Sequence, residues 1–168
     1  SSLALAPGLQ HLRHHEGQLQ ALRAVQPRVA GAAVALLEAG VGEAARTTAR
    51  RAVAIEPESA VAYQALGWVL EHDLVGRRFG KGWDRAGSLA AYRKSRQLDP
   101  TDVITRADLA ILLEHDEDGN RYTAGAQLDE AIVEYRSLRE DLDNQSLNQN
   151  LLVDLGRNDL VRVAEYGS

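Results

Sequence analysis

The strongest constraint on the fold is an internal repeat of the sequence at a spacing of 43 residues. Shifting residues 66–96 onto residues 109–139 gives 11 identities in 31 positions. The identical pairs are Leu66/Leu109, Leu70/Leu113, Glu71/Glu114, His72/His115, Asp73/Asp116, Gly76/Gly119, Arg78/Arg121, Gly82/Gly125, Tyr92/Tyr135, Arg93/Arg136 and Arg96/Arg139. A repeat of this length indicates a supersecondary unit stacked on copies of itself. We therefore expect an array of similar units in a single domain.

Each unit is expected to be a pair of helices joined by a loop. Its second half, SLAAYRKSRQLDP in one copy and AIVEYRSLREDLD in the other, carries apolar or small residues at helical spacing before a stop. Hydrophobic residues make up 45% of the chain but aromatic residues only 5%, and this balance favours helices over sheets. The sequence therefore predicts an all-α fold.

Seven positions of each unit resemble the tetratricopeptide repeat (TPR) pattern of aromatic, small and proline residues on two helices. In the middle unit they are Tyr63, Leu66, Gly67, Leu70, Ser88, Tyr92 and Pro100. The next unit has Arg106, Leu109, Ala110, Leu113, Ala131, Tyr135 and Asp143, and an earlier one has Val29, Ala32, Ala33, Leu36, Ala45, Ala49 and Pro57. The resemblance implies a right-handed α-solenoid of TPR-like helix pairs over residues 26–145, with units at 26–57, 58–100 and 101–143. The Sel1-like repeat, which has a glycine-bearing loop between its helices, is an alternative subtype.

The flanking segments are expected to be helical as well. A helical stripe of leucines, at positions 9, 12, 19 and 22, predicts an N-terminal helix within residues 1–25. Residues 146–168 are predicted to form capping helices, because the last unit of a stacked array needs its apolar face covered. The chain contains no methionine, even at position 1, so we expect either a processed product or a segment of a longer protein.

The charges and the missing cysteines argue against several classes of function. Nineteen Lys and Arg against 24 Asp and Glu give a net charge of -5, which does not fit a nucleic-acid-binding surface. Without cysteine the chain has no disulfide, thiol nucleophile or cysteine-based zinc site.

His11 and His15 have the i, i+4 spacing of a metal site but no third ligand nearby, so we expect a polar face. The longest apolar run is too short to span a bilayer, which predicts a soluble protein of the cytoplasm or periplasm.

The segment LEHDEDGNRYTAG, residues 113–125, repeats LEHDLVGRRFGKG and concentrates acidic residues between two helices. A calcium loop is not matched, because Gly119 arrives two residues early and Gln127 replaces the closing glutamate. Catalysis by His115 and Asp116 is disfavoured, because adjacent residues on a helix do not face each other. We therefore expect no catalytic residue, metal or cofactor, and no enzyme activity.

The two repeated loops are interpreted as structural braces. We expect Asp73 to pair with Arg78, and Asp116 with Arg121. Left-handed turns are expected at the glycines of the loops, which are Gly76, Gly82, Gly119 and Gly125. The aromatic residues that would pin the loops to the helices are Phe79 and Tyr122.

The resemblance to the TPR family implies that the first helices of the units line a partner-binding groove. The positions carried over are Val61, Gln64, Trp68, Glu71, His72, Ile104, Ala107, Ile111, Glu114 and His115. The first unit adds Ala30, Val34, Leu37 and Glu38. The lysine and asparagine with which the chaperone-tail-binding members clamp a carboxylate are absent from these positions. We expect an apolar floor and an acidic rim, which suit a hydrophobic peptide with basic or amide groups.

The expected function is therefore that of a protein-protein interaction scaffold that binds a protein or peptide. In an alternative reading, Trp68 and Ile111 belong to the core between repeats. A second alternative is an accessory segment of a larger bacterial enzyme, because the duplicated loops resemble repeat tails found behind transglutaminase-like domains. A third is self-association into a homo-oligomer through an exposed end of the array.

Overall fold

The computed structural model describes residues 29–145, with side chains over residues 29–140. A helix over residues 29–38 is followed by α2 (Gly42–Ile55), α3 (Ala60–Leu70), α4 (Arg85–Leu98), α5 (Val103–Leu113) and α6 (Leu128–Gln145). The all-α prediction is confirmed, because β pairing within the described residues is limited to two isolated bridges. The predicted flanking helices, 1–25 and 146–168, lie outside the described residues. Within residues 29–145, no helix is long and apolar enough to cross a membrane.

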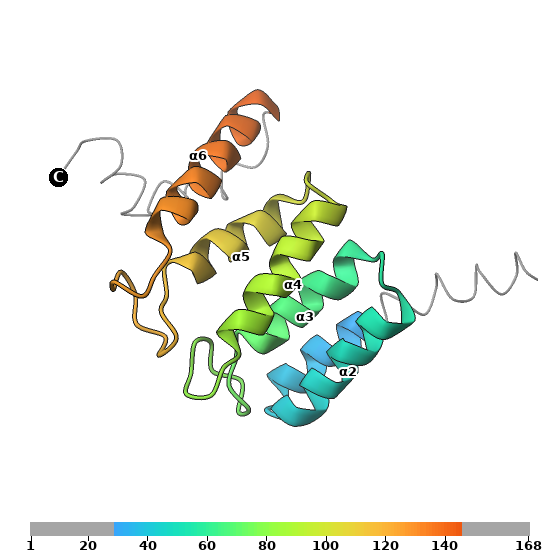
Figure 1. Cartoon of the computed structure of the whole chain (residues 1–168). Coiled ribbons are helices and arrows are strands. Elements are labelled where there is room, and N and C mark those ends of the chain that lie inside the picture. The colour runs from blue at the N-terminus through green and yellow to red at the C-terminus, as the bar shows by residue number, and fades with distance from the viewer. Residues whose placement is uncertain (1–28, 146–168) are drawn as a thin grey trace, which may run out of the picture.

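The six helices pack in sequential pairs (Figure 1). Helix 29–38 lies beside α2, α3 packs on α4, and α5 packs on α6, while α2 also contacts α3 and α4 contacts α5. Each pair therefore comes from one of the predicted units, although α6 extends two residues beyond the predicted end at 143. Neighbours in the chain are therefore neighbours in space, and successive units are joined by contacts of α2 with α3 and of α4 with α5.

Local sequence signals fix the limits of the helices. The Asp84 carboxylate accepts a hydrogen bond from the Gly87 N–H at 2.8 Å, and Asp102 caps α5 by accepting from Ile104 N–H at 3.0 Å. Such caps satisfy backbone donors that have no partner within the helix. The α4 helix ends two residues before Pro100, which lacks a backbone donor and restricts the residue before it.

Close contact between paired helices depends on small residues, as the repeat pattern predicts. A Cβ atom at Gly67 would lie 2.8 Å from the Tyr92 ring, so a larger residue where α3 crosses α4 would force the ring to move. The Ser88 hydroxyl donates to the Gly67 carbonyl at 2.8 Å. In the next unit the equivalent positions hold Ala110 and Ala131, and both are fully buried. The spacing of small residues therefore sets the distance between the helices of each pair.

The described residues bury two apolar clusters. The first joins helix 29–38, α2 and α3, and contains Ala33, Leu37, Ala45, Ala49 and Val69. The second joins α4, α5 and α6, and contains Trp83, Leu89, Tyr92, Leu109, Ala110, Leu112, Leu113, Ala131 and Tyr135. The first cluster is built largely from alanine, which is why unit one matches the repeat pattern only in a small-residue form.

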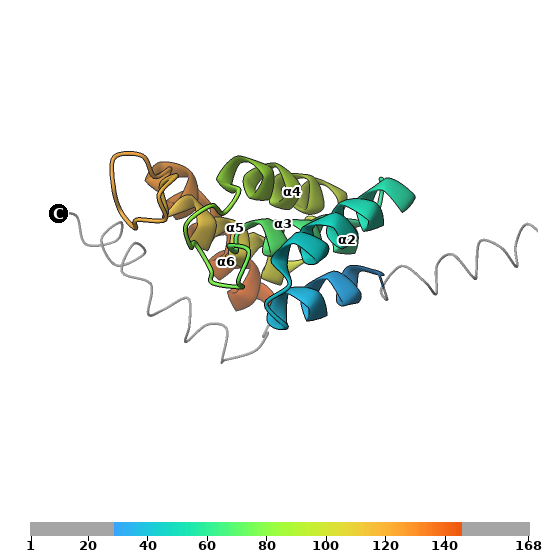
Figure 2. The same ribbon diagram turned by 90° about the horizontal axis from the view of Figure 1, so that it is seen from below.

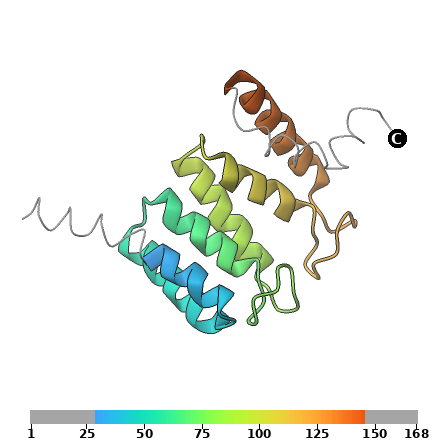
Figure 3. The ribbon, with the colours of Figure 1, turned by 180° about the vertical axis from the view of Figure 1, so that it is seen from behind.

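The connections 71–84 and 114–127 fold in the same way and project at the same end of the molecule (Figures 2 and 3). In the first connection, the Phe79 N–H donates to the Glu71 carbonyl at 2.7 Å. The second repeats this contact, with Tyr122 N–H donating to the Glu114 carbonyl at 2.9 Å. Each connection thus folds back, so that its middle part is hydrogen-bonded to the C-terminal end of the preceding helix.

The predicted ion pairs of Asp73 with Arg78 and of Asp116 with Arg121 are wrong. One Asp73 oxygen accepts two backbone N–H groups of its own turn, including that of Arg77 at 2.9 Å. The other oxygen pairs with the Arg77 Nε at 2.7 Å. Asp116 organises its turn in the same manner. Both aspartates therefore stabilise the turn backbone, and the two arginines reach other carboxylates.

The glycine prediction is confirmed at three of four positions. Positive φ angles of 86°, 85° and 79° occur at Gly76, Gly82 and Gly119. Gly125 has no positive φ, so the prediction is wrong there. Phe79 and Tyr122 instead adopt left-handed backbone, with φ of 55° and 62°. Side chains rarely take this conformation, so the hydrogen bonds that return each loop to its helix must hold both residues in it.

The two loops also contact each other. The Phe79 ring stacks on the His115 ring at a centroid distance of 3.8 Å, and Trp83 Nε1 donates to the Glu117 carbonyl at 2.9 Å. A Cβ atom at Gly119 would collide with the Phe79 carbonyl oxygen. Phe79 also packs against the second apolar cluster, as predicted, so it holds its loop both to the helices and to the neighbouring loop. The loop contacts add a second line of contact between units two and three.

Candidate partner-binding groove

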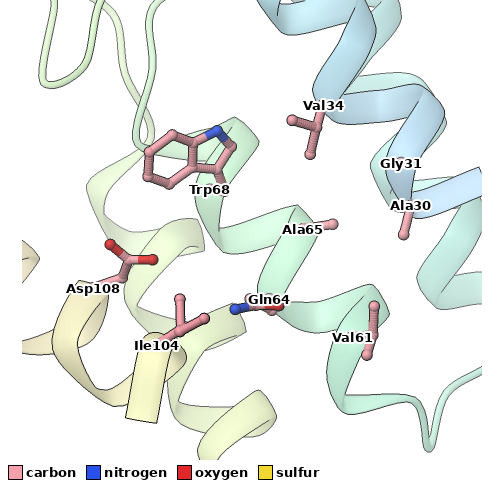
Figure 4. A pocket seen from close by; sticks show the side chains of 9 residues that line it. All are labelled: Ala30, Gly31, Val34, Val61, Gln64, Ala65, Trp68, Ile104 and Asp108. Carbon is pink, nitrogen blue, oxygen red and sulfur yellow. The ribbon is translucent and has the colours of Figure 1, made fainter. Parts of the chain in front are cut away.

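An apolar groove opens across the first helices of the three units (Figure 4). Its volume is about 390 Å³, and it is lined by Ala30, Gly31, Val34, Val61, Gln64, Ala65, Trp68, Ile104 and Asp108. Figure 4 shows the residues of helix 29–38 on one side, Ile104 and Asp108 on the other, and the α3 residues between them. The sequential packing of the pairs therefore brings together residues that are up to 78 positions apart in the chain.

Two aliphatic side chains are unusually exposed at this groove. Val61 is 57% exposed and Ile104 is 59% exposed, and the repeat places them at equivalent positions of α3 and α5. Scattered exposed aliphatic residues are normal on a protein surface, but here they border one hollow with Val34 and Trp68. Most residues of the groove lining are uncharged, so apolar side chains of a partner could pack on it without removing water from charged groups.

Trp68 supplies the largest aromatic surface of the groove and is held from two sides. Its ring lies 4.8 Å from the His72 ring, and the Arg78 guanidinium carbon lies 4.9 Å from its centroid. The indole also packs against the first apolar cluster. Trp68 is therefore both a core residue and a groove residue, and the cation above it restricts its orientation.

Six of the residues predicted for the groove line it: Ala30, Val34, Val61, Gln64, Trp68 and Ile104. The structure places Leu37 and Ala107 in the buried interior, Ile111 against the second cluster, and Glu38 on the exposed surface outside the groove lining. The lining residues that the repeat pattern missed are Gly31, Ala65 and Asp108. Asp108 lies one helical turn after Ile104, so the i, i+4 spacing was a usable signal.

The predicted acidic rim is wrong, because Glu71 and Glu114 are fully buried. They occupy the C-terminal ends of α3 and α5 beneath the two loops. Within the described residues, His72 and His115 are buried beside them, and each Nδ1 forms a hydrogen bond with the backbone carbonyl four residues earlier. Burial lowers the pKa of both histidines. All four positions therefore support the loops and do not present charge to a ligand.

Glu71 is the centre of a buried polar cluster that reaches the groove. Its Oε1 lies 2.8 Å from Arg78 Nε, and Arg78 Nη2 donates to Asp108 Oδ1 at 3.1 Å. Burial raises the pKa of Glu71 to about 8, and the neighbouring Arg78 charge opposes the rise. Neither Glu71 oxygen, nor the adjacent Tyr92 hydroxyl, has a hydrogen bond of good geometry within the described residues. The carboxylate is therefore poorly solvated, which favours its protonated form.

The next unit repeats this cluster in a better-satisfied form. Glu114 accepts a hydrogen bond from the Tyr135 hydroxyl at 2.7 Å, and its other oxygen pairs with Arg121 Nε. The three residues correspond to Glu71, Tyr92 and Arg78 at the repeat spacing of 43. A buried glutamate gripped by the loop arginine is thus a component of the repeat, and it explains why LEHD recurs in the sequence.

The described residues give no support to the metal and catalytic alternatives for the acidic segment. No group of three or more potential ligands that could hold a metal ion occurs within residues 29–140. His115 Nδ1 bonds to the Ile111 carbonyl, whereas the Asp116 carboxylate accepts from the Thr123 hydroxyl at 2.7 Å and from Asn120 N–H. These partners hold the imidazole and the carboxylate separately. The candidate pair His11 and His15 lies outside the described residues.

Comparison with known proteins identifies no family for the chain. No protein-family model matches it. No curated protein matches it either.

Proposed function

We propose that the chain is a TPR-like interaction module whose groove binds an apolar segment of a partner protein. The observation that carries the proposal is the pair Val61 and Ile104, two exposed aliphatic residues that line one hollow from equivalent repeat positions of α3 and α5. Binding would bury their surface and gain about 25 cal/mol for each Å² removed from water. Packing in sequential pairs, the small-residue contact at Gly67 and the loop contacts between units support the assignment to a solenoid.

The groove offers a ligand few polar groups. Its lining contains one ionisable side chain, Asp108, and one amide, Gln64, among nine residues. Ligand sites that are mostly apolar with few polar groups recognise by shape and orient by those groups. This composition supports the binding of a side chain or short segment.

The test uses a photo-crosslinking amino acid at position 61, with position 75 as the matched control. Val75 is 64% exposed, so it presents a similar side chain outside the groove. In extracts of cells that naturally produce the protein, we expect crosslinks from position 61 to one partner segment. The segment, made as a peptide, should bind wild-type protein and lose at least about tenfold in affinity towards the Val61→Asp, Ile104→Asp double variant.

Val75→Asp is the control substitution for the same titration. The third unit already carries Asp118 at the equivalent position, so this loop conformation accommodates an aspartate there. We expect this variant to bind the peptide like the wild type. Equal crosslinking from positions 61 and 75, or equal affinity of the double variant and the wild type, would show that the groove is not the binding surface.

A further inference from the structure

Asp108 is the only ionisable residue among the nine that line the groove in the described part of the chain. It lies on α5, one turn after the exposed Ile104, which corresponds to about 6 Å along the helix. Figure 4 shows its carboxylate on the groove side of α5, below Trp68. A partner side chain in contact with Ile104 or Trp68 would therefore bring its neighbours close to this carboxylate.

The charge around Asp108 is only partly neutralised. Its Oδ1 accepts from Arg78 Nη2 at 3.1 Å, but the same guanidinium also pairs with the buried Glu71. Asp102, the cap of the same helix, raises the pKa of Asp108 further, after the larger effect of burial. Asp102 thus adds a second carboxylate charge near Asp108, whereas Arg78 pairs with Asp108 and Glu71. The groove end at α5 therefore offers a carboxylate, that of Asp108, and no cationic side chain among its lining residues.

An anionic partner group would be disfavoured at this position, and a cationic one stabilised. The Asp108 side chain is 16% exposed, so its interaction with an incoming charge is less screened than that of a surface carboxylate. No lysine or arginine stands among the lining residues to compete for Oδ2. The complementary ligand combines an apolar side chain with an ammonium or guanidinium group, and the two lie about as far apart as Ile104 and Asp108 do along α5.

We propose that Asp108 is a specificity residue, which selects partner segments carrying a lysine or arginine next to the apolar side chain held by the groove. The inference rests on the proposed function, because it assigns the partner class of the same groove. The acidic residue that would contact a partner is then Asp108, which the repeat pattern did not assign to the groove. The predicted residues Glu71 and Glu114 are buried and cannot make this contact.

The test uses a defined set of alanine-based 15-residue peptides, acetylated and amidated at their ends. Each has a central Leu, Phe or Trp and a single Lys, Gln or Glu at one of the positions one to four residues before or after it. Fluorescence polarisation measures their affinities for the wild-type chain. We expect at least one spacing at which Lys binds about tenfold or more tightly than Glu, with Gln between them.

Variants of Asp108 separate charge recognition from structure. Asp108→Asn keeps an acceptor for Arg78 and should reduce the preference for Lys over Glu to less than about twofold, while Gln peptides bind as before. Asp108→Glu retains the charge and should retain the order of affinities. Thermal melting of each variant shows whether the fold has changed.

The outcomes distinguish the inference from the proposed function. Equal binding of Lys, Gln and Glu peptides, or a Lys preference that survives Asp108→Asn, would overturn the role of Asp108 while leaving groove binding intact. Peptides that bind the Val61→Asp, Ile104→Asp variant as well as the wild type, or no binding by any peptide, would overturn both.

Discussion

Replacement of the buried Glu71 by glutamine should change how stability depends on pH. The pKa of Glu71 is about 8 in the folded chain, against an ordinary value of 4.5. An acid whose pKa is raised by folding stabilises the fold fully below its unfolded pKa, and this contribution is lost as pH rises towards the folded pKa. Between pH 4.5 and pH 7 the loss amounts to about 3 kcal/mol, at about 1.4 kcal/mol per pH unit.

Glutamine reproduces the shape of the protonated glutamate but cannot ionise. Glu71→Gln should therefore gain in unfolding free energy relative to the wild type as pH rises, with a difference at pH 7 approaching about 3 kcal/mol. Urea denaturation at intervals from pH 5 to pH 8.5 measures this difference. Burial lowers the pKa of His72 and of His115, so protons bind these histidines more readily in the unfolded chain. Their contribution to the unfolding free energy therefore falls as pH falls, which is opposite to the effect of Glu71. Subtracting the two profiles removes that contribution.

Glu117→Gln is the matched control, because it removes the same charge from an exposed position of the second loop. It corrects for the change in net charge of the chain. A constant difference between Glu71→Gln and the wild type across the whole range would refute the reasoning, since it would mean that Arg78 compensates the buried carboxylate in full.

Three further changes test the packing. Gly67→Ala should lower the unfolding free energy by about 1–3 kcal/mol in thermal or urea melts, because the new methyl group would overlap the Tyr92 ring. Gly31→Ala should instead raise it by about 0.5–1 kcal/mol, because a Cβ there meets nothing within 4 Å and alanine favours a helix; destabilisation would contradict the placement of this helix. Tyr135→Phe should cost about 1–3 kcal/mol by removing the hydroxyl donor to the buried Glu114, and an unchanged melting curve would show that this bond contributes nothing.

The repeat in the sequence was sufficient to predict the helix pairs and their contacts. Gly67 and Tyr92 are separated by 25 residues, yet their places in the pattern predicted that one helix would pass close to the other. The same pattern predicted the positions of the loops, because LEHDLVGRRFGKG and LEHDEDGNRYTAG lie between the two helical halves of their units. Packing of this kind repeats from unit to unit and therefore leaves a periodic trace in the sequence.

The ion pairs and the groove acid left no such trace. Asp73 and Arg78 are close in the sequence, but the aspartate is used by the backbone of its own turn. The reversal of the chain at Phe79 then places Arg78 beside Glu71. Asp108 occupies the position equivalent to Ala65, which the TPR-like pattern did not assign to the groove. The i, i+4 spacing from Ile104 was the one local signal, and the proposed role of Asp108 depends on α3 and α5 lining the same groove.

The stacked loops have a mechanical consequence for the groove. Units joined only along their helix faces can rock about that single line, and rocking would open and close the space between α3 and α5. The contact of Phe79 with His115, and of Trp83 with the Glu117 carbonyl, fixes a second line away from the helix faces. Two separate lines of contact restrict the rotation of one unit against the other more than a single line does. These contacts restrict the angle between units two and three, so the proposed binding would lose less entropy than it would in an array without them.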